Sequence, residues 1–433
     1  MLKKSPYTLK KIGPLIDLLS GFAFKSNEFS DVATTEQHIR LLRGINITEN
    51  AIRNNDTIDK FWFNSSTDLD KYYLKEGDLV ISMDGSKVGR NYALVSPKDL
   101  PSLLVQRVAR IRAKEGLHLP FLHQLIGSKI FTDYVDSVKT SSGIPHISAK
   151  QIKEFSIPLP NIAIQQKIAE ILSTVDKKID LIDQKIAETE KLKTGLMQKL
   201  FSESVGVQDE NGEWQPHTEF QDSIYGNIPK TWKLFKLNQV TDYVDYRGKT
   251  PPKVESGTFL VTAKNIKNGF IDYECSKEYI PSELYDDVMS RGKPKLGDVV
   301  FTTEAPLGNV ALIDRSDVAI AQRVIKFRPK DEICLDSGYL KHFMLSTYFQ
   351  KELLQNATGS TVLGVKGKRL HVMLVCLPSI NEQIMIVDIL NEVDRKMHFL
   401  ELQKAETQQL KKGLMQKLLT GEWRVPVEET EAA

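Results

Sequence analysis

A few segments of this 433-residue sequence contain residues of the kinds found in catalytic and ligand-binding sites. The run Arg247–Thr250 includes Gly-Lys-Thr, which in nucleotide-binding loops holds phosphate. The upstream glycine of such a loop is absent here, and Pro251 blocks the helix that must follow. Thr250–Lys253 also differs from the acidic-or-Asn-Pro-Pro-aromatic tetrad of amino-methyltransferases, and no glycine-rich dinucleotide or S-adenosylmethionine loop follows a predicted strand. The sequence therefore predicts no nucleotide site.

Metal ligands and nucleophiles are also poorly placed. His118 and His123 are five residues apart, so they do not share a helical face, and metal ligation is not expected. The three cysteines, at positions 275, 334 and 376, are too few and too scattered for a disulfide framework or a zinc site, which favours a reducing cytosol. The acidic pair Asp286-Asp287 lacks a nuclease-like lysine context. These patterns predict a binding protein with no catalytic residue.

Two segments of the sequence, which would belong to the scaffold of any site, occur twice. Residues 159–165 reappear at 377–383, and residues 193–200 reappear at 411–418, with a constant offset that is half the chain length. Solenoid repeats are far shorter, at roughly 20–50 residues. The chain is therefore predicted to be a duplicated domain plus a duplicated helix, so that one polypeptide imitates a two-fold dimer.

Each copy is predicted to contain a β-rich lobe. Strand-like runs at 78–83 and 102–111 have counterparts at 297–302 and 319–327. A helical stripe follows in each lobe, and its apolar residues are expected to face the core. The stripe consists of Phe121, Leu122, Leu125, Ile130, Phe131 and Val135 in one copy, and of Tyr339, Leu340, Phe343, Tyr348, Phe349 and Leu353 in the other.

A long amphipathic helix closes each copy. Its apolar positions recur at alternating steps of three and four over about five heptads, which predicts a coiled-coil seam. The seam runs through Ile168, Ile171, Leu172, Val175, Ile179, Ile182, Ile186, Thr189, Leu192 and Leu196, and in the second copy through Ile386, Ile389, Leu390, Val393, Met397, Leu400, Lys404, Thr407, Leu410 and Leu414. About 36 residues would span roughly 54 Å. The two helices are expected to pair antiparallel, and Lys404 in the seam is interpreted as a register device.

The composition fits a globular protein that binds a polyanion at two places. Hydrophobic residues make up 41% and charged residues 26% of the chain. The net charge of +2 divides into +5 for residues 1–160, +1 for 161–200, −6 for 201–225, +5 for 226–378 and −3 for 379–433. Two mildly basic lobes joined by an acidic, exposed connector suit DNA, although such a charge is also ordinary for a domain of this size. No signal peptide or membrane span is predicted, which points to the cytoplasm.

The expected fold class is α+β, with two similar β-rich domains, two long helices in an antiparallel coiled coil and pseudo-two-fold symmetry. The predicted boundaries are 1–158 for the first lobe, 159–202 for the central helix, 203–228 for the connector, 229–376 for the second lobe, 377–420 for the distal helix and 421–433 for the tail.

Several of these segments resemble the specificity (S) subunit of Type I restriction–modification systems. Residues 165–172 and 195–200 resemble the conserved central helix of that family, and 383–390 and 413–418 its distal helix. The runs 20–26, 247–252 and 75–80 are also similar to family sequences. The duplicated layout, with all of these segments in order, covers essentially the whole chain.

The resemblance implies a division of labour. Each lobe would be a target-recognition domain that reads one half of an asymmetric, bipartite site in double-stranded DNA. The helices would set the spacer and dock two methyltransferase (M) subunits, and two restriction and motor (R) subunits would join them. S-adenosylmethionine, ATP and Mg would belong to those partners, with no cofactor in this chain. A partner would flip the target base out of the duplex.

Polar residues in predicted loops are the candidates for DNA contact. Arg and Asn suit readout of base edges, whereas Lys more often contacts phosphate. The candidates in the first lobe are Lys25, Arg43, Asn46, Ser86, Lys87, Arg90, Ser141, Ser142 and His146. Those in the second lobe are Lys249, Lys253, Lys264, Asn265, Thr358, Ser360, Lys366 and Lys368. Arg107 and Arg323, which lie in a Gln-Arg-Val triplet shared by both lobes, are interpreted as scaffold.

A different function stays open at this point. The chain could be a coiled-coil scaffold that bridges two protein-binding lobes without nucleic acid. The dependence of DNA affinity on salt separates the two hypotheses, because phosphate contacts release counterions.

Overall fold

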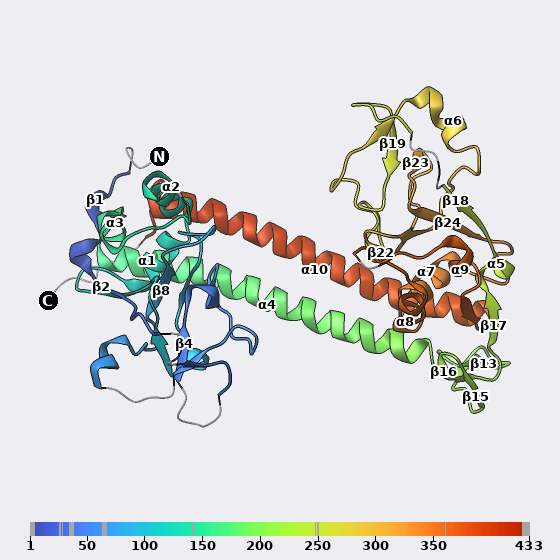
Figure 1. The fold of residues 1–433 in the computed structure, drawn as a ribbon, viewed down its shortest axis with the longest axis horizontal. Helices are drawn as coiled ribbons and strands as arrows, with labels where there is room; N and C mark the ends of the chain where they lie inside the picture. Colours follow the sequence, from blue (N-terminus) through green and yellow to red (C-terminus); the bar gives the residue numbers. More distant parts are fainter. Residues whose placement is uncertain are drawn as a thin grey trace. The chain divides into compact units, whose positions relative to one another are not determined.

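The chain divides into two compact units in a computed structural model. Unit 1 comprises Met1–Asp183 with Leu402–Ala433, and unit 2 comprises Gln184–Glu401 (Figure 1). The structure describes residues 5–25, 27, 29–33, 39–62, 67–140, 143–246, 248, 251–359 and 361–426.

The lobe of unit 1 is built on an antiparallel sheet with the strand order β2-β11-β8-β9. A second sheet, β10-β4-β7-β3, contains a parallel pair, β10 with β4. Two further pairs are antiparallel, β1 with β12 and β5 with β6. The strands are β1 (Thr8–Lys11), β2 (Ile16–Ser20), β3 (Phe29–Ser30), β4 (Ile39–Leu42), β5 (Ile47–Thr48), β6 (Ala51–Ile52), β7 (Phe61–Trp62), β8 (Leu79–Ser82), β9 (Tyr92–Leu94), β10 (Ser102–Leu104), β11 (Val108–Ala113) and β12 (Ser156–Leu159).

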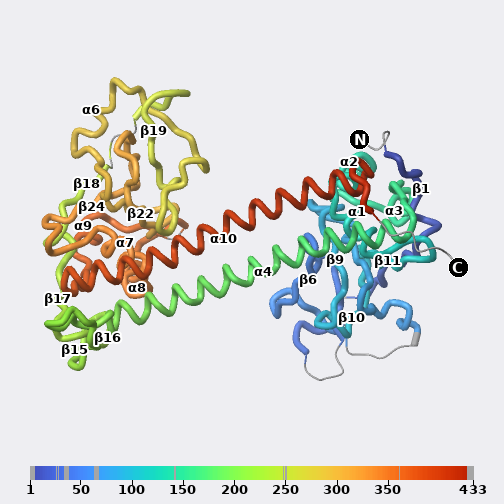
Figure 2. The backbone as a smooth tube through the Cα atoms, turned by 180° about the vertical axis from the view of Figure 1, so that it is seen from behind, coloured from blue at the N-terminus to red at the C-terminus, as the bar shows by residue number. Residues whose placement is uncertain are grey.

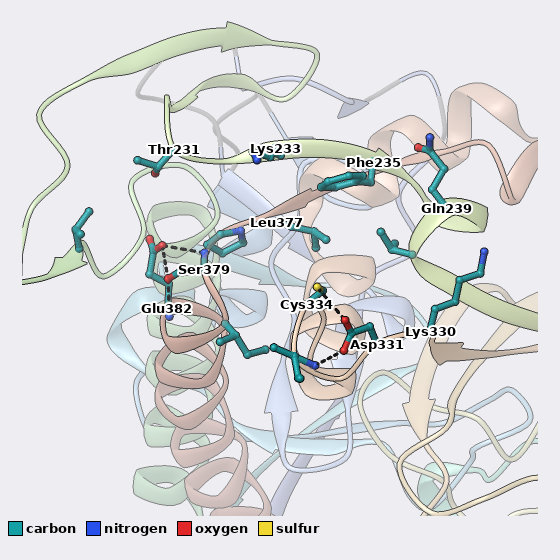
Figure 3. Close-up of a pocket in the computed structure, with 15 residues that line it drawn as sticks. Thr231, Lys233, Phe235, Gln239, Lys330, Asp331, Cys334, Leu377, Ser379 and Glu382 are labelled. Atoms are coloured by element: carbon teal, nitrogen blue, oxygen red, sulfur yellow. Dashed lines mark hydrogen bonds between the residues drawn. The ribbon is translucent and has the colours of Figure 1, made fainter.

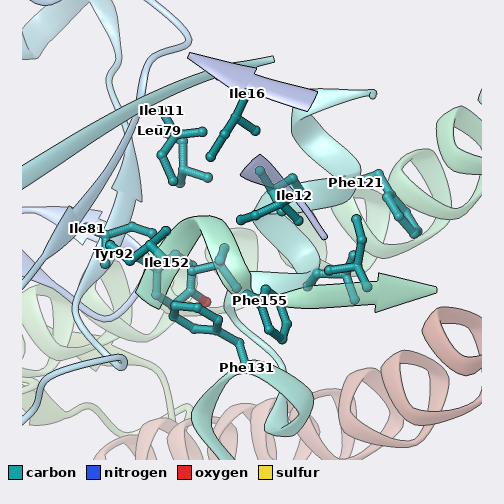
Figure 4. Packing of buried hydrophobic residues seen from close by; sticks show 14 of the residues in the cluster. Ile12, Ile16, Leu79, Ile81, Tyr92, Ile111, Phe121, Phe131, Ile152 and Phe155 are labelled. Carbon is teal, nitrogen blue, oxygen red and sulfur yellow. The ribbon is translucent and has the colours of Figure 1, made fainter. Parts of the chain in front are cut away.

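Three short helices form the core of unit 1 with the central sheet. They are α1 (Leu119–Ile126), α2 (Lys129–Val138) and α3 (Ala149–Glu154). Phe121 and Phe131 are fully buried in this core, close to Ile12 and Phe155 (Figure 4). The apolar stripe predicted from the sequence is therefore confirmed as core, and burial of each such aromatic side chain contributes about 2–3 kcal/mol.

Unit 2 repeats this plan. Its central sheet has the order β18-β24-β21-β22, a smaller sheet β20-β19-β23 contains the parallel pair β19 with β23, and β17 pairs with β25. Helices α7 and α8 stand in the places of α1 and α2. The elements are β17 (Lys233–Lys236), α5 (Leu237–Val240), β18 (Thr241–Asp245), β19 (Thr258–Val261), β20 (Tyr279–Ile280), α6 (Tyr285–Val288), β21 (Val299–Thr303), β22 (Leu307–Leu312), β23 (Val318–Ile320), β24 (Val324–Pro329), α7 (Ser337–Leu345), α8 (Thr347–Asn356), α9 (Gly367–Leu370) and β25 (Leu374–Leu377).

The two long helices, α4 (Ile162–Leu200) and α10 (Ile380–Thr420), pack against each other, and each unit contains part of both (Figure 2). In unit 1, Asp176 pairs with Lys411 at 2.5 Å and Asp183 pairs with Lys404 at 2.6 Å. From one pair to the next, the residue number rises on α4 and falls on α10, so the predicted antiparallel pairing is confirmed. Lys404 makes its seam contact through this ion pair.

Unit 2 contains the counterpart of one of these pairs. Lys193 contacts Asp394 at 2.5 Å, and both residues lie at the repeat offset from Lys411 and Asp176. The same ion pair therefore recurs in both copies of the repeat.

The predicted seam is wrong at one position in each helix. Leu192 and Leu410 are 50% and 54% exposed, whereas Lys193 and Lys411 are mostly buried at the position one residue later. A regular heptad continues from Thr189 through position 193 rather than 192. The aliphatic part of each lysine fills the seam while its ammonium group reaches a carboxylate, which an apolar pattern alone does not predict.

The acidic connector is mostly exposed, as the sequence predicted, but it has regular structure that the sequence did not predict. It forms two hairpins in unit 2, β13 (Val207–Gln208) with β14 (Trp214–Gln215) and β15 (Phe220–Ser223) with β16 (Gly226–Pro229). Phe201 and Trp232, which flank it, are buried in the core of unit 2.

Glu382, in the first turn of α10, anchors this connector. Its Oε1 accepts hydrogen bonds from Ser204 Oγ at 2.8 Å and Trp232 Nε1 at 3.3 Å, and it contacts His217 Nε2 at 2.8 Å. Ser379 donates to the other carboxylate oxygen, beside a cavity of about 580 Å³ (Figure 3). Burial raises the pKa of Glu382, but these hydrogen bonds outweigh it and leave that pKa below its ordinary value.

Within the described part of the chain, no helix is both long and apolar enough to cross a membrane. The same residues contain no group of three or more His, Cys, Asp or Glu side chains placed to hold a metal ion.

Candidate nucleic-acid interface

Three segments of unit 1 meet at one end of its central sheet. They are the end of β8, the turn between β10 and β11, and the loop before α3. The Met83 N–H donates to the Arg107 carbonyl at 2.8 Å, and the Ile147 N–H donates to the Met83 carbonyl at 2.9 Å. We call residues 82–91, 105–107 and 143–147 loop edge 1.

Unit 2 has the same junction. The Thr303 N–H donates to the Arg323 carbonyl at 2.9 Å, and the Val365 N–H donates to the Thr303 carbonyl at 3.0 Å. Residues 302–309, 321–323, 357–359 and 361–366 form loop edge 2. The backbone frame is thus shared, while the loops that it presents have unlike sequences.

A cavity of about 660 Å³ opens on loop edge 1. Arg43, Ser86 and Lys87, three of the predicted contact residues, line it together with Asp84 and Arg107. The β4–β5 loop reaches this cavity because Gly44 lies tightly against β8: a Cβ atom at position 44 would come within 2.9 Å of the Ser82 hydroxyl.

Other predicted residues of the first lobe are engaged inside it. Asn46 is fully buried, accepts the Arg43 N–H at 3.2 Å and donates to Asp59 at 2.8 Å. The Arg43 guanidinium itself donates to the Ile58 carbonyl. Both residues therefore hold the β4–β5 loop in its conformation.

Two further first-lobe candidates, Arg90 and His146, also belong to loop edge 1, whereas Lys25 lies outside it. Arg90 pairs with Asp136 at 2.9 Å, and His146 is half-buried and joined by its backbone to Thr140. Lys25 is exposed beyond β2. Ser141 and Ser142 lie outside the described residues.

In the second lobe, Thr358 and Lys366 are exposed on loop edge 2, and Lys368 follows in α9. Thr358 closes a tight hairpin through two backbone hydrogen bonds with Gly364, at 2.9 and 3.0 Å. The structure thus brings part of the predicted set together at the same place in the second lobe as in the first.

The other second-lobe candidates lie in the loops around β19 and β20. Asn265 is fully buried and accepts the Thr262 N–H at 3.0 Å, as Asn46 does in the first lobe. Lys264 beside it is exposed, and Lys253 pairs with Glu278 at 2.6 Å. Lys249 and Ser360 lie outside the described residues.

Two arginines that sequence reasoning assigned to the scaffold belong to these edges. The side chains of Arg107 and Arg323 are 63% and 52% exposed, and both backbones are left-handed, with φ of 66° and 73°. The shared Gln-Arg-Val triplet marked both arginines as equivalent positions of the two lobes, but the sequence could not show that their side chains point outward.

Each lobe is fixed to the helix pair by a buried glutamine. Gln165 Oε1 accepts the His118 N–H at 2.8 Å, and its amide donates to the carbonyls of Gly116 and Pro160 at 3.1 and 2.9 Å. Gln383 makes the same three contacts in unit 2, with Asp336, Cys334 and Pro378.

A second polar contact supports the first lobe. Asn50 lies 2.6 Å from His123 Nε2, and the neighbouring Gln124 donates to Asp176 on α4 at 2.9 Å. Burial lowers the pKa of His123 to about 4, so this imidazole is neutral at pH 7.

The comparable place in unit 2 uses different side chains. Lys341 and His342 both contact Asn391 on α10, at 3.3 and 3.0 Å, and burial lowers the pKa of Lys341. Both lobes are therefore attached to long helices through buried polar groups, which favours a fixed orientation of each lobe on its helices.

Comparisons with known proteins give one consistent result. Residues 4–191 and 229–412 match the family described as Type I restriction modification DNA specificity domain. The chain is 28% identical over 359 residues to the Type I restriction enzyme MjaVIII specificity subunit of Methanocaldococcus jannaschii, a match that covers 81% of this chain and 80% of the relative. It is 24% identical over 380 residues to the EcoBI specificity subunit of Escherichia coli, covering 86% and 76%.

Solved structures share the fold. The Type I restriction–modification S subunit from M. genitalium matches with a TM-score of 0.58 at 15% identity, over 96% of each chain. A chain from a structure of type I R-M system assembly and conformational transition matches with a TM-score of 0.54 at 17% identity, over 98% of this chain and all of that one.

Proposed function

Because this chain belongs to the Type I restriction–modification DNA specificity family, we propose that its two lobes read the two halves of a split DNA site. The chain is the DNA specificity subunit of such a system, and this subunit is the non-catalytic component. Membership of the family implies DNA binding and assembly with other subunits.

The observation that carries the proposal is the repeated junction with unlike loops. Met83 and Thr303 organise the same backbone frame in both lobes, yet loop edge 1 presents Ser86 and Lys87 where loop edge 2 has a shorter loop containing Pro306. Equal frames place the loops alike, and unequal side chains meet different base edges. The two half-sites are therefore proposed to differ in sequence.

The exposed candidates are proposed to divide by chemistry. Lysines 25, 87, 264, 366 and 368 suit phosphate contact, whereas Ser86 and Thr358 suit base edges. Asn46, Asn265 and Arg43 are proposed to act indirectly, because their polar groups already hold the loops that carry the contacts.

The long helices are proposed to set the spacer and to dock two methyltransferase subunits. Exposed apolar residues occur on them at matching positions, Leu181 with Phe399 and Leu192 with Leu410, each pair separated by the repeat offset. Isolated exposed leucines are ordinary, but a duplicated set on helices that carry few other apolar residues outward suits two copies of one partner. Restriction subunits would complete the complex, with S-adenosylmethionine, ATP and Mg bound by the partners.

A salt series tests this proposal. The chain is combined with its methyltransferase partner, and affinity for duplex DNA is measured at several salt concentrations. The logarithm of the association constant is expected to fall linearly with the logarithm of the salt concentration, with a slope of about −0.9 per phosphate contacted. An absent or salt-independent signal would contradict the proposal and favour a scaffold without nucleic acid.

A further inference from the structure

Arg107 and Arg323 share an unusual backbone. Five described non-glycine residues have positive φ, and these two arginines are among them. Each occupies the turn that connects the parallel-paired strand of the second sheet to the central sheet of its unit, β10 to β11 and β23 to β24. A left-handed arginine is strained, and such strain persists where the surrounding structure fixes it, often at functional sites.

The backbone of each arginine is hydrogen-bonded inside its lobe, whereas its side chain is exposed. The carbonyls accept hydrogen bonds from Met83 and Thr303, as described above. Arginines that serve the scaffold of these lobes behave differently: Arg110 is buried, and Arg112 donates twice to the buried Asp78. Arg107 and Arg323 instead extend over the loop edges.

Each exposed guanidinium is paired with one carboxylate. Arg107 contacts Asp84 at 3.0 Å, and Arg323 contacts Glu304 at 2.8 Å. Exposed ion pairs of this kind stabilise a fold very little. Each guanidinium group can therefore leave its carboxylate for a stronger partner. A phosphate group binds a guanidinium group in the same bidentate manner as a carboxylate does.

Both lobes carry this arginine although the sequences of their loops differ. A residue that is the same in both lobes cannot distinguish one half-site from the other, so its target must be common to all DNA. We propose that Arg107 and Arg323 each bind one phosphate of the DNA backbone, at the same place in each half-site. Asp84 and Glu304 hold the guanidinium groups in the free protein. The inference rests on the proposed function, since it requires that the loop edges face DNA.

Glycine variants separate this role from a structural one. Arg107→Gly and Arg323→Gly remove the side chain but suit the left-handed backbone, so the melting temperature is expected to stay unchanged or to rise. Each is expected to weaken DNA binding by roughly eightfold at 0.1 M salt, and to reduce the salt slope by about 1, with the same loss on cognate and unrelated duplexes. The double variant should reduce the slope by about 2.

Three further variants serve as controls for the DNA-binding measurements. Arg107→Lys retains the charge and should retain the slope. Arg315→Ala removes an exposed arginine that pairs with Asp317 away from the loop edges, and should leave the slope unchanged. Asp84→Asn frees Arg107 and is expected to tighten binding to unrelated duplexes.

The outcomes are distinct. If the wild-type complex shows no salt-dependent binding, the proposed function itself fails. If it does, but Arg107→Gly and Arg323→Gly leave the slope unchanged, the phosphate contact is refuted. A loss confined to the cognate duplex would also refute it and would indicate base reading. A lowered melting temperature without any change in DNA affinity would return both arginines to the scaffold.

Discussion

Replacing Gln165 by alanine is expected to loosen the first lobe from its long helix. The side chain is fully buried and makes three hydrogen bonds, to His118, Gly116 and Pro160. Each such bond contributes about 1 kcal/mol net, and a donor left without an acceptor costs about 1–3 kcal/mol. The variant should therefore destabilise unit 1 by about 2–4 kcal/mol.

The duplication supplies a second, independent test of the same reasoning. Gln383 makes the same contacts in unit 2, so Gln383→Ala should cost a similar amount there. The two glutamines share no partner, so the double variant should lose the sum to within about 0.5 kcal/mol.

Hydrogen exchange followed by mass spectrometry can assign each loss to its unit. Peptides covering 115–126 should exchange faster in Gln165→Ala, and those covering 333–345 faster in Gln383→Ala. Gln166→Ala is the matched control, because this neighbour on α4 is exposed and alanine is at least as favourable in a helix. Equal protection in Gln165→Ala and Gln166→Ala would refute the reasoning.

Two further predictions concern buried ionisable groups. Burial lowers the pKa of His123 from its ordinary 6.5 to about 4, so the free energy of unfolding should fall as pH drops below 6.5 and level off near pH 4. The loss should be about 2 kcal/mol at pH 5. His123→Gln should flatten this part of a plot of melting temperature against pH, and an unchanged plot would contradict this role of His123. Glu382→Ala should leave several buried donors without an acceptor, cost about 3 kcal/mol and expose the connector 203–228 to hydrogen exchange, whereas a loss of protection spread equally over both units would count against its anchoring role. Because the pKa of Glu382 is lowered, its contribution is present above the ordinary carboxyl pKa and is lost as pH falls through the folded value.

The duplicated frame was predictable because backbone architecture follows apolar spacing. The aromatic stripe that includes Phe121 and Tyr339 is buried, and the long helices pack antiparallel. The seam was misread at Leu192 because a hydrophobic pattern cannot show that a lysine stem fills the interior when a carboxylate lies opposite. The two hairpins of the connector were not predicted, because their strands are short and mostly exposed and so show no apolar alternation.

Individual contact residues were less predictable. Loop asparagines can read bases or hold a loop, and only the structure shows that the side chains of Asn46 and Asn265 are turned inward. Conversely, Arg107 and Arg323 occupy strand-like runs, so a left-handed turn that exposes them could not be inferred from their neighbours. Which residues contact DNA stays a prediction for every candidate.

Exchange of one lobe tests directly whether each lobe reads one half of the DNA site. Residues 229–376 would be replaced by the corresponding lobe of a related specificity subunit, and the chimaera combined with the same methyltransferase partner. Methylated positions would then be mapped by sequencing across a genome. We expect one half of the recognised site to change while the other half and the spacer are retained. A change in both halves would contradict this expectation.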